Sequence, residues 1–313
     1  MKPTQEIKDT SNAPDLILGS AMWGWTVAES TCFRLLDDFY AAGFRGVDSA
    51  TNYPINKIPS DFRRSERILQ EWIRVHGVKD LRITMKVGSL DNLRSPDCNL
   101  SKSFLLFCME SYSALFSENL DTIMIHWDNR DSIAGIADTF SGLKEIVRNG
   151  YRVGLSGIRY PELYASQNQS EKLDFSIQIK HNLLHSDYQR YAPFHGERRF
   201  FAYGINAGGL KLNPGAYHEN SSLKVRGGDV ATPPSLLAPL AEFLKNAAPF
   251  HTLNDLAMLY AWYHPDMAGL LLGVSGTEQL KDSLNRYETL RQGDFRDYYR
   301  QLLILQQEHA STL

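Results

Sequence analysis

The sequence has few cysteines, little net charge and no long apolar segment. Its 313 residues include three cysteines, Cys32, Cys98 and Cys108, without C-x-x-C spacing. This usage is typical of a reduced, cytoplasmic protein. The net charge of −3 gives no electrostatic footprint for a nucleic acid. No apolar run approaches the roughly 20 residues that span a bilayer, and the polar N-terminus carries no apolar core of a secretion signal. We therefore expect neither a membrane nor a nucleic-acid partner.

The chain also lacks a Gly/Ser-rich or Pro-rich linker. With 43% hydrophobic and 22% charged residues, the composition is that of a globular domain. We expect residues 1–313 to form one domain, with a polar N-terminal extension over residues 1–14. The least regular segment, residues 204–234, is long for a simple connection. Such segments are usually functional, and we expect this one to overhang the site.

Strand-like and helix-like patterns alternate along the chain. Strands are expected at residues 15–18, 46–48, 81–86, 122–126, 152–156, 175–179, 199–203 and 268–273. Helices are expected at residues 29–42, 65–76, 101–116, 133–148, 254–263, 277–291 and 297–307. Several helical patterns end at a glycine, the residue that adopts the left-handed conformation without strain. Alternation of this kind indicates parallel βαβ units, and eight of them in this length favour a closed (β/α)₈ barrel.

Three polar side chains end successive strand-like runs. Asp48 ends FRGVD, Lys86 ends LRITMK and His126 ends LDTIMIH. Parallel neighbours lie about 4.8 Å apart, and their carboxyl ends meet at one edge, where barrel folds build their sites. Tyr53 follows Asp48 in the next loop. We therefore expect an acid, a base, an imidazole and a phenol to converge.

This set of groups is suited to proton transfer. A tyrosine is a weak acid with an ordinary pKa of about 10, and a nearby protonated lysine stabilises the phenolate. Asp48 can hold Lys86 in place, and His126 can orient a substrate oxygen or relay a proton. The arrangement favours protonation of a carbonyl oxygen as its carbon receives a hydride, or the reverse reaction.

The ordered motifs resemble those of the aldo-keto reductase superfamily over residues 16–284. LGSAMWG is similar to its first strand and loop, GVDSATNYP to its D-T-A-x-x-Y signature, ITMKVG to its lysine segment and IMIHWDNRD to its histidine segment. The resemblance implies a (β/α)₈ barrel. It also implies that Tyr53 is the general acid, that Lys86 and Asp48 tune it, and that His126 orients the carbonyl.

The same resemblance implies a nicotinamide cofactor, NADP or NAD. GLSGIRY corresponds to the family's G-x-S-N, with Gly157 in place of the asparagine, and SIQIKHNLL to Q-x-x-Y-N-L-L, with His181 in place of the tyrosine. Tyr203 in FFAYGINAGGLK would stack on the nicotinamide, although by itself it is interpreted equally well as a buried strand aromatic. The residues assigned to the cofactor are Met22, Trp23, Ser156, Gln178, Tyr203, Gly204, Asn206, Gly208, Ser275 and Gln279.

The adenine end departs from the family pattern. Asp282 and Ser283 replace the usual Glu-Asn pair. Three uncharged residues stand where the family places its basic 2′-phosphate clamp: Gly273, Ser275 and Gln279. Phosphate contacts are normally charge-assisted, so we expect weak discrimination between NADP and NAD. Lys281 and Arg286 lie nearby in the sequence and are interpreted as solvated helix residues, and the alternative is that one of them supplies a charge to the phosphate.

The substrate end has fewer distinctive features. Three tryptophans lie just past strand ends and are expected to form apolar walls, with plain core aromatics as the alternative: Trp23, Trp25 and Trp127. The run Asp128-Asn129-Arg130 would supply a polar edge that suits a hydroxylated or sugar-like carbonyl compound. Three loop cations would suit an anionic substituent or are ordinary solvated residues: Lys57, Arg63 and Arg94.

Three functions are compatible with these features. The leading hypothesis is an NAD(P)(H)-dependent oxidoreductase acting on an aldehyde, a ketone or the matching alcohol. The alternative is a nucleotide-binding regulatory protein on the aldo-keto reductase scaffold, with little or no turnover. His126 argues against it, because a binding module does not need a full catalytic set. A cofactor-free lyase or isomerase is the third, and Tyr203 and Gln178 make it less attractive.

Overall fold

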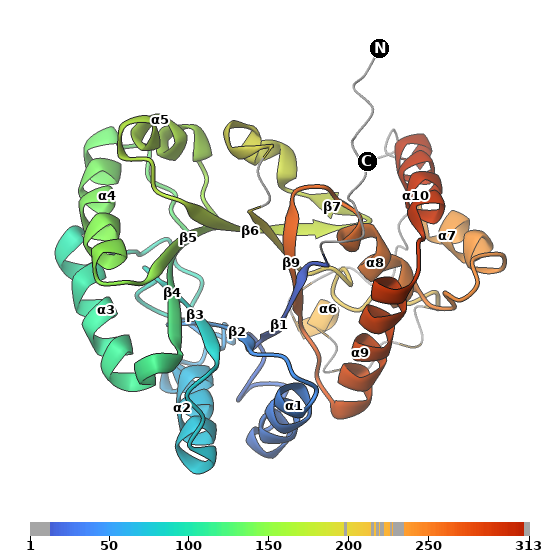
Figure 1. Ribbon diagram of the computed structural model, residues 1–313, viewed down its shortest axis with the longest axis horizontal. Helices are drawn as coiled ribbons and strands as arrows, with labels where there is room; N and C mark the ends of the chain where they lie inside the picture. Colours follow the sequence, from blue (N-terminus) through green and yellow to red (C-terminus); the bar gives the residue numbers. More distant parts are fainter. Residues whose placement is uncertain are drawn as a thin grey trace.

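A closed barrel of parallel strands forms the centre of the protein (Figure 1). The computed structural model describes residues 13–196, 199–213, 216, 219, 222–225, 227 and 235–309. The barrel strands are β1 (Asp15–Gly19), β2 (Gly46–Ala50), β3 (Arg82–Val87), β4 (Leu120–His126), β5 (Arg152–Ser156), β6 (Phe175–Asn182), β8 (Phe200–Tyr203) and β9 (Met267–Leu272). They pair in the order β5-β4-β3-β2-β1-β9-β8-β6, and β6 pairs back to β5. Over the described residues the predicted eight-stranded (β/α)₈ barrel is confirmed.

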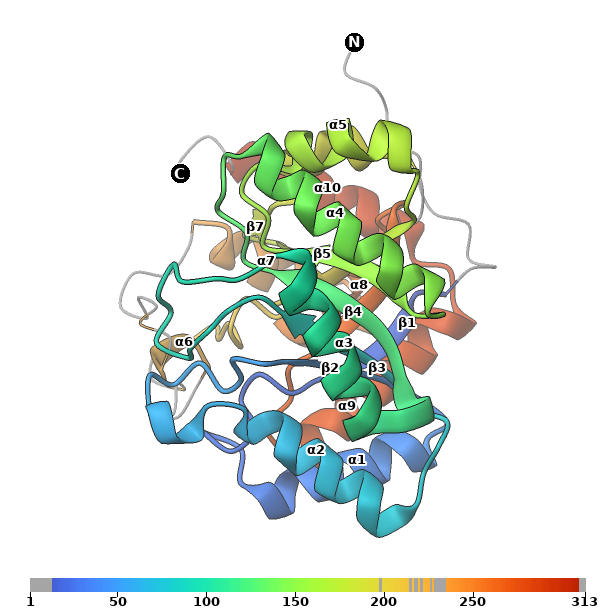
Figure 2. The same ribbon diagram turned by 90° about the vertical axis from the view of Figure 1, so that its left-hand side faces the viewer.

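Helices surround the barrel and cover its outer face. They are α1 (Glu29–Ala41), α2 (Arg64–His76), α3 (Lys102–Phe116), α4 (Ile133–Arg148), α5 (Pro161–Glu171), α6 (Ser222–Val225), α7 (Leu237–Leu244), α8 (Leu253–Trp262), α9 (Thr277–Gln292) and α10 (Arg296–His309). Figure 2 shows α3, α4 and α5 along one flank of the barrel. None of the helices in the described part of the chain is long and apolar enough to cross a membrane.

Three helices among the described residues were not predicted, α5, α6 and α7. Helix α5 buries only Pro161 and Tyr164, so its sequence shows no apolar stripe of helical period. Helix α7 contains Pro239 in its first turn, where the missing N–H has no intrahelical partner to lose. A proline in this position made the segment resemble a loop in the sequence. Helix α6 is a single turn within the segment predicted as a loop.

The described residues of the sixth connection of the barrel form no α-helix. After β6 the chain forms a short antiparallel strand, β7 (His185–Ser186), and a 3₁₀ segment, η3 (Tyr188–Phe194), before β8 begins. Two further 3₁₀ turns are η1 (Pro59–Asp61) and η2 (Ser117–Asn119). Of the predicted extension over residues 1–14, only Ala13 and Pro14 are described. Of the predicted loop over 204–234, residues 214–215, 217–218, 220–221, 226 and 228–234 lie outside the described residues.

The strand register brings the predicted polar residues to one end of the barrel. Lys86 pairs with Ala50 at the end of β2, His126 pairs with Ser156, and Ser156 pairs with Gln178. Strand β2 continues two residues beyond Asp48, so this carboxylate lies deeper in the barrel than a strand end. Strands buried on both faces, such as β2, are typical of a parallel barrel.

Candidate active site

Three buried polar side chains are joined at the carboxyl end of the barrel, and we call them the polar triangle: Asp48, Lys86 and Gln178. Lys86 Nζ forms an ion pair with Asp48 Oδ2, and both side chains are 2% exposed. Gln178 lies on β6, opposite β2 in the barrel order. Its Nε2 donates to Asp48 Oδ1 at 2.5 Å, and its Oε1 accepts from Lys86 Nζ at 3.3 Å. A carboxylate and an ammonium are thus held together in the barrel interior.

Tyr53 and His126 lie next to the polar triangle. Lys86 Nζ is 4.9 Å from the centroid of the Tyr53 ring. The His126 ring lies edge-on to Tyr53, with 6.0 Å between the centroids and 88° between the planes. Tyr53 is 9% exposed and His126 is 3% exposed. The structure therefore brings together all four residues predicted to be catalytic.

The electrostatic environment fixes the charge of two of these groups. Burial lowers the pKa of Lys86, but the charges of Asp48 and Tyr53 and hydrogen bonds to the same two side chains together outweigh it, so its pKa lies above the ordinary value. Burial, with the Lys86 charge beside it, holds the pKa of His126 well below its usual range. At neutral pH the site therefore contains a charged ammonium and an uncharged imidazole. Among the described residues, His126 Nδ1 has no hydrogen-bond partner.

Trp127 and Gly157 form a matched pair beside His126. Both have left-handed backbones, with φ of 61° at Trp127 and 68° at Gly157. The backbone N–H of Trp127 donates to the Ser156 carbonyl at 3.0 Å. The centroid of the Trp127 ring is 4.5 Å from that of His126. A Cβ on Gly157 would lie 2.5 Å from Trp127 Cδ1. The absence of a side chain at position 157 therefore allows the indole to lie where it does.

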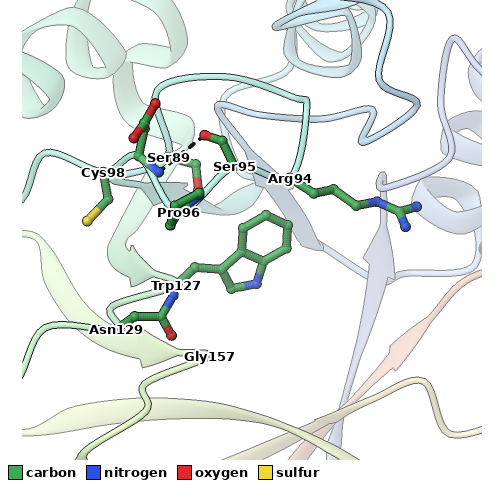
Figure 3. Close-up of a pocket in the computed structure, with 9 residues that line it drawn as sticks. Ser89, Arg94, Ser95, Pro96, Cys98, Trp127, Asn129 and Gly157 are labelled. Carbon is green, nitrogen blue, oxygen red and sulfur yellow. Dashed lines mark hydrogen bonds between the residues drawn. The ribbon is translucent and has the colours of Figure 1, made fainter.

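A cavity of about 370 Å³ lies beside the indole (Figure 3). Three loops at the carboxyl ends of β3, β4 and β5 line it with Ser89, Arg94, Ser95, Pro96, Asp97, Cys98, Trp127, Asn129 and Gly157. Figure 3 shows the Arg94 side chain extending from its loop beyond the Trp127 ring. Arg94 forms no ion pair with any described residue. The cavity thus combines one aromatic face with several hydrogen-bonding groups.

The predicted polar edge after β4 is only partly correct. Asp128 is 1% exposed and accepts hydrogen bonds from Arg130 Nε at 2.9 Å, from Arg130 Nη2 at 2.8 Å and from the Tyr164 hydroxyl at 2.7 Å. These contacts fix the loop against α5, and they hold the pKa of the Asp128 carboxyl below its usual range although burial opposes this. Of the three predicted edge residues, only Asn129 lines the cavity.

The predicted nicotinamide residues lie at the expected end of the barrel. Ser156 and Gln178 are buried there, and burial raises the pKa of Tyr203 to about 12. Asn182 Nδ2 donates to the Gly204 carbonyl at 2.9 Å, and the Asn206 carbonyl accepts two backbone N–H groups. The Gly208 backbone is left-handed, with φ of 80°.

The N-terminal tryptophans differ in burial. Trp23 is fully buried in the main core, so it supports the site from behind and does not line an open wall. Its indole N–H has no partner among the described residues. Trp25 is half-buried, as is Met22, whose carbonyl accepts from the N–H groups of Trp25 and Val27.

The adenine-end residues engage one another. Ser275 donates to Gln279 Oε1 through its backbone N–H at 2.9 Å and its hydroxyl at 3.1 Å. Lys281 is exposed, as predicted. The prediction of a solvated Arg286 is wrong, because its side chain is 11% exposed and forms an ion pair with Asp255 on α8.

A buried chain of hydrogen bonds behind Lys86 was not predicted. The Thr51 hydroxyl donates to the Lys86 carbonyl at 3.2 Å and lies 2.9 Å from the Tyr112 hydroxyl. Tyr112 in turn donates to Glu66 at 2.8 Å, and Glu66 pairs with Arg63. Arg63 is 44% exposed but paired with Glu66, so it is not a free loop charge. The segment RRSE contains Arg63 and Glu66, but only the fold shows that they connect to Lys86 through Tyr112 and Thr51.

Within the described residues, no group of three or more His, Cys, Asp or Glu side chains is arranged to hold a metal ion. Comparison with known proteins relates the chain to a family and to a shorter relative. The model of the Aldo/keto reductase family matches residues 15–298. An uncharacterized 11.2 kDa protein in the crtE 3′ region of Pseudescherichia vulneris is 36% identical over 78 residues, which are 24% of this chain and 76% of that protein. The first match spans most of the chain, and the second a quarter of it.

Proposed function

The chain belongs to the aldo/keto reductase family, and on this premise we propose that it transfers a hydride between a nicotinamide cofactor and an aldehyde or ketone, with Tyr53 as general acid and base. Members of the family are in general NAD(P)-dependent oxidoreductases that act on small carbonyl compounds. The observation that carries the proposal is the buried ion pair of Lys86 and Asp48 beneath Tyr53.

The proton path follows from this geometry. The Lys86 ammonium stabilises negative charge on the Tyr53 oxygen, so this hydroxyl can donate a proton to a carbonyl oxygen and regain it in the reverse direction. A neutral His126 can donate one hydrogen bond to the same oxygen without competing as a stronger acid. A positioned general acid contributes about 10²–10⁴-fold to such a step.

The described residues fit a nicotinamide dinucleotide, which when bound supplies or accepts the hydride. Gly204, Gly208 and Gly209 have φ of 63°, 80° and 88°, so the backbone after β8 can approach a pyrophosphate without side-chain obstruction. Helix α9 has no side-chain N-cap, which leaves its first N–H groups available to a phosphate. Ser156 and Gln178 would hold the carboxamide, and Tyr203 would lie against the ring.

The fit to a 2′-phosphate is weaker. Ser275 and Gln279 are uncharged and bond to each other, and Arg286 is already paired with Asp255. Among the described residues of α9's first two turns, Lys281 is the one cation, and it is exposed. We propose that the protein accepts both NADP and NAD with little discrimination.

For the substrate we propose a small hydroxylated or sugar-like carbonyl compound. The Trp127 ring would contact its apolar face, while Asn129, Ser89 and Ser95 would bond to hydroxyl groups in the cavity beside it. We also propose that the protein works in a reducing, cytoplasmic compartment, because Cys32 and Cys108 are buried free thiols. No nucleic-acid or membrane partner is part of the proposal.

The test uses the purified protein with NADPH and NADH. Nucleotide binding is measured by fluorescence titration, and turnover is followed on aldehydes, ketones and aldoses by the absorbance of the reduced nicotinamide. Binding with turnover that Tyr53→Phe abolishes would support the proposal. Tight binding without turnover on any compound would favour the regulatory nucleotide-binding protein instead. Turnover that is independent of nucleotide would favour a lyase or isomerase.

A further inference from the structure

Gln178 contacts both members of the catalytic ion pair from the far side of the barrel. Its amide N–H reaches Asp48 Oδ1 at 2.5 Å and its carbonyl accepts from Lys86 Nζ at 3.3 Å. All three side chains of the polar triangle are 2% exposed, so water does not replace any of these contacts. Each oxygen of the Asp48 carboxylate therefore has its own donor, Lys86 on one and Gln178 on the other.

This arrangement limits where the Lys86 ammonium can point. A lysine ammonium has three N–H donors. Asp48 and Gln178 take two of them, and the third is left on the side of Tyr53, whose ring centroid is 4.9 Å from Nζ. Without Gln178, the ammonium could rotate about its contact with Asp48, and the carboxylate could turn with it.

We propose that Gln178 is a positioning residue, which locks Asp48 and Lys86 in one orientation and thereby directs the free N–H of Lys86 towards Tyr53. Its effect on the ion pair is a property of the protein itself. Its effect on turnover rests on the proposed function. The role is compatible with a bound ligand, because a glutamine amide has a second N–H and a second lone pair that remain for another partner.

Removal of the amide has a predictable direction. Four groups on other elements act on the Lys86 charge: Asp48 on β2, Tyr53 in the loop after β2, His126 on β4 and Tyr203 on β8. A methionine at 178 would leave all four in place and remove one acceptor from the ammonium. Since hydrogen bonds to the charged form favour it, the titration of Lys86 should move to lower pH.

The experiment reads the lysine directly in the free protein. The protein is labelled with ¹⁵N-lysine, and the slowly exchanging buried ammonium is assigned by its absence in Lys86→Met. In Gln178→Met we expect this signal to broaden through faster exchange, with a lower titration midpoint. In Gln178→Glu, the Lys86 signal should be as sharp as in the parent at pH values where the introduced carboxyl beside Asp48 is protonated. In that form the carboxyl again donates one hydrogen bond and accepts another. Gln169→Met, on the exposed face of α5, is the matched control.

Turnover supplies the second measurement. Loss of one hydrogen bond to a charged group corresponds to about tenfold or more, so kcat of Gln178→Met should fall by that factor, with a shifted pH profile. If Lys86 exchanges and titrates in Gln178→Met as in the parent, the positioning role is wrong. If Gln178→Met does not fold, Gln178→Glu decides instead. The positioning role is then wrong if the slowly exchanging Lys86 signal is missing from Gln178→Glu at every pH. If the parent shows no turnover but Gln178→Met still alters the Lys86 signal, the proposed function is wrong and the positioning role stands.

Discussion

Gly157→Ala is a small change that should disturb the site out of proportion to its size. The added methyl group would lie 2.5 Å from Cδ1 of Trp127 and 3.2 Å from its Nε1. The position also has φ of 68°, where an L side chain is strained. The indole cannot simply withdraw, since its own backbone is left-handed and bonded to Ser156. We expect Trp127 to move, and His126 to move with it.

Gly157→Ala is expected to lower the free energy of unfolding for two reasons. A non-glycine residue in the left-handed conformation costs about 1–2 kcal/mol. Overpacking against a fixed ring costs about 1–3 kcal/mol more, so Gly157→Ala should lower the free energy of unfolding by about 2–5 kcal/mol. Because the His126 and Trp127 rings lie 4.5 Å apart, a shift of about 1 Å is transmitted to the imidazole and would lower kcat by up to about 100-fold.

The control isolates the clash from the backbone strain. Gly77 ends α2 with φ of 64° and has nothing within 4 Å of a Cβ, so Gly77→Ala carries the strain alone. Unfolding in urea is compared for both variants, for Trp127→Ala and for the Gly157→Ala/Trp127→Ala double variant. The double variant should recover about 1–3 kcal/mol relative to additivity.

Equal destabilisation by Gly77→Ala and Gly157→Ala would refute this reasoning. So would strict additivity of the two changes at 157 and 127. Either result would mean that the indole does not depend on the space left by Gly157.

Three further predictions concern the catalytic set and the cofactor. Tyr53→Phe should lower kcat by about 10²–10⁴-fold while nucleotide binding is retained, and a rate within threefold of the parent in steady-state assays would contradict the general-acid role. Lys86→Met should be inactive and about 3–5 kcal/mol less stable at pH 7, because Asp48 is left as a buried unpaired charge. The folded-state pKa of Lys86 is raised, so its stabilising contribution is complete below about pH 10.4 and is lost as the pH rises through the folded pKa. Urea unfolding from pH 8 to 12 should show this loss in the parent and not in Lys86→Met. Fluorescence titration should show less than tenfold preference between NADPH and NADH, whereas a hundredfold preference for NADPH would reveal a basic residue on the phosphate that these contacts do not identify.

The alternation of strands and helices was enough to predict the barrel and to place the residues that we expect to be catalytic. Asp48, Lys86 and His126 follow apolar runs at regular intervals, and in a parallel barrel the carboxyl ends of neighbouring strands meet at one face. This inference needs only strand order and direction, which alternating strands and helices fix. The loop position of Tyr53 followed from its distance along the chain after Asp48. Such local signals were weakest for α5, whose buried face is too small to produce a periodic pattern.

Which polar groups remain free of internal partners is set by the packing of the folded chain. Asp128 was expected at the site edge, but it accepts hydrogen bonds from Arg130 and Tyr164. Arg286 was expected to be solvated, but it forms an ion pair with Asp255. Gln178 meets Asp48 from 130 residues away because the barrel closes and places β6 opposite β2. Hydrogen bonds between side chains require the two partners to be placed to within a few tenths of an ångström, and their strength depends on burial. Both are set by closure and packing, and neither leaves a periodic signal in the sequence.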